Sequence, residues 1–355
     1  MARTKDQRLY RGGPMRAVWP SPSRPARRRA AQRADADYGV PAEASWREFD
    51  WPASTHRIEI AGRQVNYVDI GSGDRAVICI HGLGGCWQNW LETLPALAEA
   101  GYRAIALDLP GFGRSEMPVE PISISGFART VDELSSALEL GAVALVGNSM
   151  GGFTAAETAI GHPDRVERLV LVDAAGISTT LARNWLSERV GRIMVTGAIG
   201  GAAPTDHAKA MRMMRRPGFL QIGLGAVVRH PTLISRELIA EQLDSLNSPG
   251  FMPSLEAIIG HDFIPRLGEI ACPALVVQGD QDVLVPVGDA HEFVDRIPHA
   301  ALLILHDTGH VPMWERPQTF NTATLEFLDQ DVAPDHPDAI QSPLLAEAQA
   351  DGGLA

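Results

Sequence analysis

The sequence has no apolar run long enough to cross a lipid bilayer. A membrane-spanning helix needs about 20 predominantly apolar residues in succession, and the longest candidates, such as FLQIGLGAVV at 219–228, are much shorter. We therefore expect no stable insertion into a membrane.

Cysteine is scarce. The 355 residues include three cysteines, Cys79, Cys86 and Cys272. An odd number of cysteines in a long chain does not form a disulfide framework, and free thiols are typical of a reducing compartment. The sequence therefore favours a cytoplasmic protein, with Cys86 expected as a small packing residue.

Motifs for cofactors and metals are also missing. GLGG at 82–85 is followed by Cys86 and Trp87, whereas a phosphate-binding loop continues with lysine and a hydroxyl residue. The chain has no clustered histidines and cysteines at metal-ligand spacing. We expect neither a cofactor nor a metal ion.

Positive charge is confined to the start of the chain. Residues 1–34 hold nine Arg and one Lys against Asp6, a net charge of +9, so that the remaining residues carry −21 of the total of −12. An acidic body disfavours nucleic acid as a partner. We expect residues 1–45 to form a basic, disordered arm without the apolar segment of a targeting signal.

The body of the chain alternates two patterns. HRIEIAGRQVNYVDIG at 56–71 alternates apolar and polar residues around Ala61 and Gly62, which predicts a β-hairpin. Short apolar runs then alternate with stretches of helical periodicity, a pattern typical of a parallel sheet covered by helices on both faces. The strands are expected at 76–80, 102–109, 142–147, 166–173, 274–280 and 301–309, and the helices at 87–100, 125–140, 150–162, 287–297 and 319–328.

Residues 176–265 interrupt the alternation. They have helical patterns such as ISRELIAEQLDSL at 234–246, a cluster of three methionines at 211–214, and no strand-like runs. We expect an inserted helical lid at 176–265 on an α/β core formed by 46–175 and 266–330, and a polar tail at 331–355. The fold class predicted is a mostly parallel, doubly wound α/β sheet with this lid.

VGNSMGG at 146–152 joins an expected strand to an expected helix. A sharp turn between a strand and a helix requires small neighbours, and it lifts the serine hydroxyl above the carboxyl edge of the sheet. Ligands bind at that edge in open α/β sheets. Ser149 is therefore the candidate nucleophile.

A serine hydroxyl is a weak nucleophile at neutral pH and needs a base, which an acid orients. Asp282 follows the expected strand at 274–280, and His310 follows the one at 301–309. Both loops leave the same edge of the sheet as Ser149. The sequence therefore predicts a Ser149–His310–Asp282 triad.

HGLGG at 81–85 follows the first parallel strand. Its glycines allow backbone N–H groups to point at a developing oxyanion, and we expect the N–H groups of Leu83 and Met150 to be the donors. We expect His81 to hold this loop in place rather than to act as a base.

With these motifs in order, the chain resembles the α/β-hydrolase fold family over about residues 55–330. The order serine, aspartate, histidine is that family's order. DLPGFGRS at 108–115 resembles the loop after its fourth strand, and HPDRVERLVLVD at 162–173 resembles its sixth strand.

Other residues compete for the roles of acid and base. Asp280 matches the family spacing less well than Asp282, because the family's acid usually lies three residues after the glycine that Gly279 matches. Asp173 ends the sixth strand, where some relatives keep the acid. His306 and His291 lie inside a strand pattern and a helix pattern, which favours packing or surface roles.

The resemblance also bears on the reaction. Relatives that open epoxides or displace halide use a carboxylate at the elbow, so Ser149 implies acyl transfer instead. We expect a carboxylesterase-like or lipase-like hydrolase of class EC 3.1.1, acting on a small-molecule ester with an apolar acyl group. Transfer to an alcohol other than water would use the same residues.

Two alternatives remain open. GNSMGG and LISRELIAEQ at 233–242 resemble the carbon–carbon hydrolases that cleave ring-fission products of aromatic compounds. That family, however, has an arginine where this chain has Gln242 and a tryptophan where it has Val311, and the arginine pairs with the acidic substrate. The other alternative is a catalytically idle member that binds a small molecule. The oligomeric state is open.

Overall fold

A computed structural model of the chain describes residues 37–178, 221, 224–245 and 248–330. The predicted tail at 331–355, most of the basic arm and the methionine cluster lie outside these residues. Within them, no helix combines the length and the apolar character that a bilayer crossing requires.

The described residues form one eight-stranded sheet with the order β1-β2-β4-β3-β5-β6-β7-β8. Strand β2 is antiparallel to both of its neighbours, and the six strands from β4 to β8 are parallel. The strands are β1 Thr55–Ile60, β2 Arg63–Ile70, β3 Ala76–Ile80, β4 Arg103–Leu107, β5 Val143–Asn148, β6 Val166–Val172, β7 Ala274–Gly279 and β8 Ala300–Leu305.

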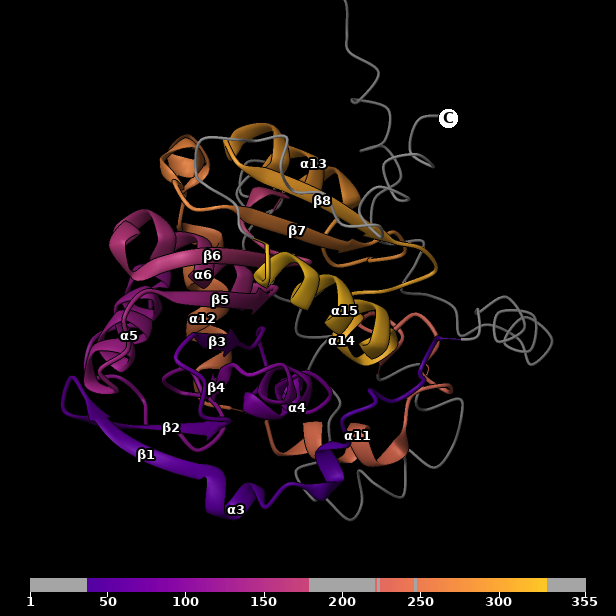
Figure 1. Cartoon of the computed structure of the whole chain (residues 1–355). Coiled ribbons are helices and arrows are strands. Elements are labelled where there is room, and N and C mark those ends of the chain that lie inside the picture. Colours follow the sequence, from indigo (N-terminus) through magenta and orange to yellow (C-terminus); the bar gives the residue numbers. More distant parts are fainter. Residues whose placement is uncertain (1–36, 179–220, 222–223, 246–247, 331–355) are drawn as a thin grey trace, which may run out of the picture.

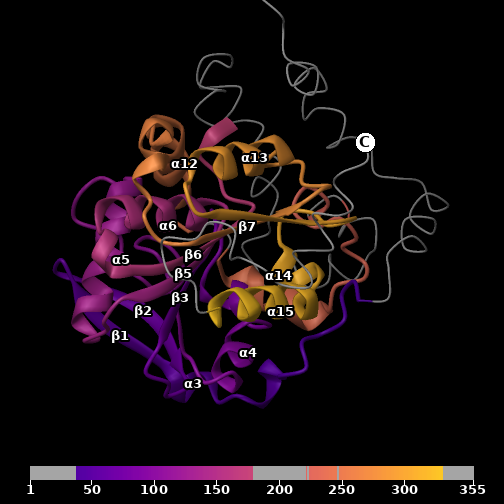
Figure 2. The ribbon, with the colours of Figure 1, turned by 45° about the horizontal axis from the view of Figure 1, so that its top comes forward.

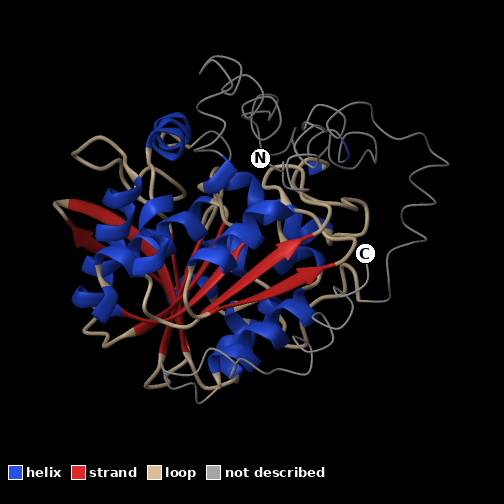
Figure 3. Cartoon of the chain, turned by 90° about the horizontal axis from the view of Figure 1, so that it is seen from above, coloured by secondary structure: helices blue, strands red, loops and turns tan. Residues whose placement is uncertain are grey.

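Helices cover both faces of this sheet (Figures 1 and 3). Buried side chains of α4 and α15 pack on one face and those of α5, α6 and α13 on the other. Figure 2 shows the same arrangement of the helices about the sheet. The predicted doubly wound α/β class is confirmed. These helices are α4 Leu94–Glu99, α5 Ile124–Ala137, α6 Met150–Gly161, α13 Val287–Arg296 and α15 Pro317–Leu328, and the shorter or peripheral ones are α3 Trp51–Ser54, α11 Arg236–Glu241, α12 Phe251–Gly260 and α14 Pro312–Glu315.

The two faces of β3 show why the sheet must be covered twice. Val77 and Cys79 point into the core beneath α4 and α15, whereas Ile78 and Ile80 point into the core beneath α5 and α6. All four are fully buried. Side chains alternate across a strand, so an entirely apolar strand needs a hydrophobic layer on each side.

The winding direction reverses at β3. From β3 the chain passes through α4 to β4 on one side, and it then returns through α5 to β5 on the other. Ligand sites of open α/β sheets lie at the carboxyl ends of the strands on either side of such a switch. In this chain those ends carry the loop after β3 and the turn after β5, which are the two motifs singled out above.

The predicted hairpin is confirmed. Ile60 pairs with Arg63, which leaves a two-residue turn. Ala61 and Gly62 have φ values of 49° and 73°, as a type I′ turn requires, and this turn matches the twist of the paired strands.

Three boundaries differ from the prediction. The helix expected at 87–100 is a 3-10 turn at Trp87–Trp90 followed by α4, because Pro95 has no N–H to continue a helix and starts a new one. The strand expected at 301–309 ends at Leu305. Residues 37–45, assigned to the arm, are packed against the body, with Tyr38 and Ala42 buried.

Candidate active site

Ser149 occupies a strained turn between β5 and α6. Its φ of 56° and ψ of −116° lie outside the regions that non-glycine residues favour. Backbone hydrogen bonds hold the turn: Ser149 N–H donates to Val172 O at 2.9 Å, and Ser149 O accepts from the N–H groups of Phe153 and Ala175. This geometry is that of a nucleophile elbow.

The glycines around Ser149 are required by the space available. A Cβ on Gly151 would lie 2.1 Å from Ile80 O, and a Cβ on Gly147 would lie 2.3 Å from Gly151 O. A Cβ on Gly152 would lie 2.7 Å from the side chain of Ala174. The motif therefore allows α6 to start directly against the ends of β3 and β6.

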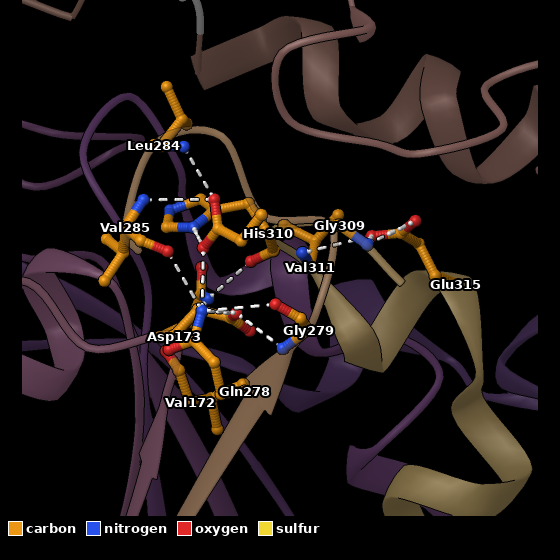
Figure 4. A network of polar contacts seen from close by, with 12 residues as sticks. Val172, Asp173, Gln278, Gly279, Leu284, Val285, Gly309, His310, Val311 and Glu315 are labelled. Atoms are coloured by element: carbon orange, nitrogen blue, oxygen red, sulfur yellow. Dashed lines mark hydrogen bonds and ion pairs between the residues drawn. The ribbon is translucent and has the colours of Figure 1, made fainter. Parts of the chain in front are cut away.

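Asp282 and His310 meet at the carboxyl edge of the sheet, where Figure 4 shows His310 and its neighbours. His310 Nδ1 and Asp282 Oδ2 are 2.6 Å apart, and the side chains are 7% and 0% exposed. Because an ionised carboxylate only accepts hydrogen bonds, Nδ1 is the donor and Nε2 is left for a substrate or serine proton. Asp282 Oδ1 also accepts from the N–H groups of Leu284 and Val285 at 2.7 and 3.1 Å.

Asn148 links this pair to the elbow. Its side-chain Nδ2 donates to His310 O at 3.0 Å and to Val172 O at 3.2 Å. The residue immediately before the candidate nucleophile therefore fixes the backbone of the candidate base. The structure thus brings the loops of Ser149, Asp282 and His310 together, while their catalytic roles stay a prediction.

Glu315 fixes the loop of His310 from the other side. Its buried carboxylate accepts from Gly309 N–H at 2.9 Å and from Val311 N–H at 3.3 Å, so both neighbours of His310 are held. The carboxylate also accepts from Tyr38 O–H and, at 2.8 Å, from Arg229 N–H. The segment before the core and residue Arg229 of the predicted lid thus converge on the same loop.

The loop after β3 lies against the elbow. A Cβ on Gly82 would be 3.2 Å from Ser149 Cβ and 3.1 Å from Asn148 Oδ1. Leu83 follows Gly82 directly, and Met150 is the first residue of α6. The backbone that carries the two expected oxyanion donors is therefore next to Ser149, and their role remains a prediction.

His81 holds the loop after β3. Its Nε2 accepts from Leu109 N–H at 3.0 Å, so Nδ1 carries the proton and donates to Gly82 O at 2.8 Å. The side chain is fully buried, and this burial lowers its pKa to about 4 despite the opposing bond to Gly82. His81 is thus a neutral anchor between the loops after β3 and β4, as the sequence predicts.

The anchor gives the protein a specific sensitivity to acid. The unfolded chain protonates His81 near pH 6.5, whereas the folded chain resists protonation until about pH 4. Stability is therefore lost as pH falls through this window, by about 2 kcal/mol between pH 8 and pH 5 from this group. Urea unfolding should show that the advantage of wild type over His81→Gln shrinks by this amount.

The matched control is His56→Gln, because His56 is exposed on β1. It controls for the loss of an imidazole at a site that holds no loop in place, and the pH-dependent change should be larger in His81→Gln. An advantage over His81→Gln that is constant across this range would show that His81 is not held neutral.

The rival residues lie elsewhere. Asp280 is bonded to His306, at 3.2 Å, and His306 is 74% exposed and lies just after β8 rather than inside it. His291 is on the exposed side of α13. Cys86 is buried, 1% exposed. Asp173, in contrast, lies directly behind Asp282.

Among the described residues, Asp173, Asp282 and His310 form one group whose potential metal-ligand atoms lie within 4.8 Å of one another. A metal ion between Asp282 and His310 would hold both ligand atoms at about 2.0–2.2 Å. Tetrahedral ligands at that distance would be well over 3 Å apart, whereas these atoms are separated by 2.6 Å. The group therefore fits a hydrogen-bonded relay rather than a metal site.

Comparisons with known proteins agree with this geometry. The family model of the alpha/beta hydrolase fold matches residues 75–317. A 2-hydroxy-6-oxononadienedioate/2-hydroxy-6-oxononatrienedioate hydrolase of Burkholderia vietnamiensis is 32% identical over 284 residues, which cover 75% of this chain and 91% of the relative.

Two solved structures extend the comparison. A meta-cleavage product hydrolase of Pseudomonas fluorescens superposes with a TM-score of 0.62 and 27% identity, covering 77% of this chain and 97% of that one. A membrane phospholipase A superposes with a TM-score of 0.58 and 26% identity, covering 78% and 86%.

Proposed function

The chain is a hydrolase of the α/β-hydrolase fold family, and we propose that it acts through an acyl-enzyme on Ser149. The observation that carries this proposal is the 2.6 Å bond between His310 and Asp282, together with the bond from Asn148 that joins the loop of His310 to the Ser149 elbow. A serine on a strained elbow, an oriented imidazole and a glycine-rich loop beside them are the parts that acyl transfer needs.

The reaction follows from these parts. Ser149 Oγ attacks the substrate carbonyl while His310 Nε2 takes its proton, and Asp282 stabilises the imidazolium that forms. The N–H groups of Leu83 and Met150 stabilise the oxyanion. His310 then protonates the leaving group, and water cleaves the acyl-enzyme with His310 again acting as base.

The relatives favour a carbon–carbon bond as the bond cleaved. The curated relative named above is a hydrolase of a 2-hydroxy-6-oxo dienedioate, and one of the two solved structures is a meta-cleavage product hydrolase. We place hydrolysis of a ring-fission ketone first and ester hydrolysis, which the sequence alone favours, second. In the first reaction the acyl part is released as a carboxylic acid, and the carbon leaving group takes a proton.

Ester hydrolysis remains the second candidate because of Gln242. Its buried amide accepts from Asn89 Nδ2 at 2.6 Å and donates to Gln88 O and Leu238 O at 3.0 and 3.1 Å. A neutral side chain with both N–H groups engaged replaces the arginine of the carbon–carbon hydrolases. It cannot pair with an acidic substrate, whereas an uncharged ester needs no such partner.

Turnover of a ring-fission 2-hydroxy-6-oxo dienoate and of p-nitrophenyl esters from acetate to laurate tests this order. We expect a kcat/KM at least about tenfold higher for the ketone than for any ester, a difference of about 1.4 kcal/mol in transition-state binding. A clear chain-length optimum among the esters with an inert ketone would make ester hydrolysis the function. No turnover of either class would support the binding-only alternative.

A further inference from the structure

Asp173 is a second carboxyl group buried behind the triad. It follows β6 directly, its φ is 43°, and its side chain is fully buried. Oδ1 accepts from Gly279 N–H at 2.9 Å and from Gln278 Nε2 at 2.8 Å. Oδ2 is buried as well, and within the described part of the chain no N–H or hydroxyl group donates to it. One carboxyl oxygen is therefore satisfied and the other is not.

The carboxyl groups of Asp173 and Asp282 lie close together, and besides burial a side-chain hydrogen bond between them is one cause of the raised pKa of Asp173. Their carboxyl oxygens belong to the group whose members lie within 4.8 Å of one another. Gln278 Nε2 bridges them, at 2.8 Å from Asp173 Oδ1 and 3.3 Å from Asp282 Oδ2. Two buried carboxylates at this distance cannot both be ionised without strong repulsion.

The surroundings do not supply the missing positive charge. Among the described titratable groups, Asp282 and Glu315 act on Asp173 and both are acids. Asp289, another acid, acts on Asp282, and His310 is already bonded to Asp282. Burial, followed by the charge of Asp282, raises the pKa of Asp173 well above its usual range, although the N–H of Gly279 opposes this shift. Repulsion between the two carboxyl groups therefore favours the state in which one of them holds a proton.

Hydrogen-bond donors decide which carboxyl keeps its negative charge. Asp282 accepts from His310 Nδ1 and from the N–H groups of Leu284 and Val285. Within the described residues, Asp173 accepts only from the N–H of Gly279 and from Gln278 Nε2, which it shares with Asp282. Since each donor stabilises the ionised form, the charge stays on Asp282 and the proton on Asp173.

We propose that Asp173 is a neutral carboxylic acid whose O–H donates to Asp282, which makes it a positioning residue that sets how strongly Asp282 stabilises protonated His310. This inference rests on the proposed triad. A hydrogen bond donated by Asp173 delocalises the negative charge of Asp282, and Asp282 then stabilises the imidazolium of His310 less strongly. The base is then free of its proton at a lower pH than it would be beside an isolated carboxylate.

Two substitutions separate a neutral from a charged Asp173. Asp173→Asn retains size, neutrality and an N–H donor for Asp282, so the midpoint of the acidic limb of kcat/KM should move by less than about 0.3 pH unit. Asp173→Leu removes the donor, and the midpoint should rise by about one pH unit, equivalent to a tenfold loss on the acidic side. A midpoint that falls by about one unit in Asp173→Asn would show that wild type carries a charge at Asp173 and would overturn the proposal.

A spectroscopic measurement reads the proton without using activity. The infrared difference between wild type and Asp173→Asn at pH 7.5 should contain the carbonyl stretch of a protonated carboxyl group. Asp289→Asn is the matched control: Asp289 is also buried, but its pKa, raised by burial to about 6, leaves it ionised at this pH. Absence of the band in the Asp173 difference spectrum would overturn the proposal even if the triad assignment held.

The pH dependence of the unfolding free energy gives a further test, which remains valid even if the proposed function is wrong. The unfolded chain ionises Asp173 near pH 3.8, whereas the folded chain keeps the proton, so this group lowers stability increasingly as pH rises above 4. The unfolding midpoint of Asp173→Asn relative to wild type should therefore increase from pH 5 to pH 8. A difference that is constant over this range contradicts a neutral Asp173.

Discussion

Replacing Ser149 with alanine is expected to lower kcat by about 10⁶-fold, the size of effect seen when the nucleophile of a serine hydrolase is removed. Alanine keeps the Cβ that the turn accommodates and removes only the oxygen that attacks the carbonyl. Single-turnover rates on the ring-fission ketone and on p-nitrophenyl esters provide the measurement.

The control for this substitution is the unfolding midpoint in urea. Ser149→Ala should unfold at a urea concentration close to that of wild type, because the backbone bonds of Ser149 to Val172, Phe153 and Ala175 do not involve its side chain. A variant that folds normally and keeps a kcat within tenfold of wild type would remove Ser149 from the mechanism.

Asp282→Asn is expected to lower kcat by about 10⁴-fold, as loss of the triad acid does when geometry is preserved. The amide can present N–H₂ to His310 Nδ1, which forces the imidazole into the tautomer that carries its proton on Nε2. That tautomer cannot accept the proton of Ser149. The measurement is kcat for the substrate that wild type turns over fastest.

Asp280→Asn is the matched control, because Asp280 lies two residues away and is bonded to His306 rather than to His310. Its kcat should remain within about threefold of wild type, as expected for a change at a partly exposed site away from the triad. The reverse pattern, with loss in Asp280→Asn and retention in Asp282→Asn, would move the acid to Asp280.

Local sequence patterns predicted the sheet and its order of elements well. Fully apolar runs such as AVICI, each followed by helical periodicity, have few other stable arrangements than a parallel sheet covered on both faces. The predicted ends of helices and strands were less accurate where a single residue determines where the element stops. Pro95 splits the helix expected at 87–100, and β8 ends before Asp307, whose φ is 48°.

The supporting network of the site could not be predicted in the same way. Asn148 and Glu315 are ordinary polar residues in the sequence, and their importance comes from bonds to the loop of His310. Gln278 lies in an apolar strand, and only the fold shows that it bridges two carboxyl groups. The signal available was a buried polar residue inside a strand, since such residues normally need a partner.

Packing of the segment before the core was missed for a related reason. Residues 37–45 contain no long apolar run, yet Tyr38 donates to Glu315 and Ala42 N–H donates to Glu92 Oε2 at 2.9 Å. A short segment is held by a few specific contacts rather than by periodicity, and these contacts join residues far apart in the sequence.

The most direct test of the acyl-enzyme is to trap it. Wild type is mixed with the ring-fission ketone, or with a p-nitrophenyl ester if the ketone is inert, quenched in acid during the first turnover, digested and mapped by mass spectrometry. We predict the mass of the acyl group on the peptide that contains Ser149, and its absence in Ser149→Ala. Product formation in the first turnover with no adduct on Ser149, or with the adduct on another residue, would contradict the mechanism.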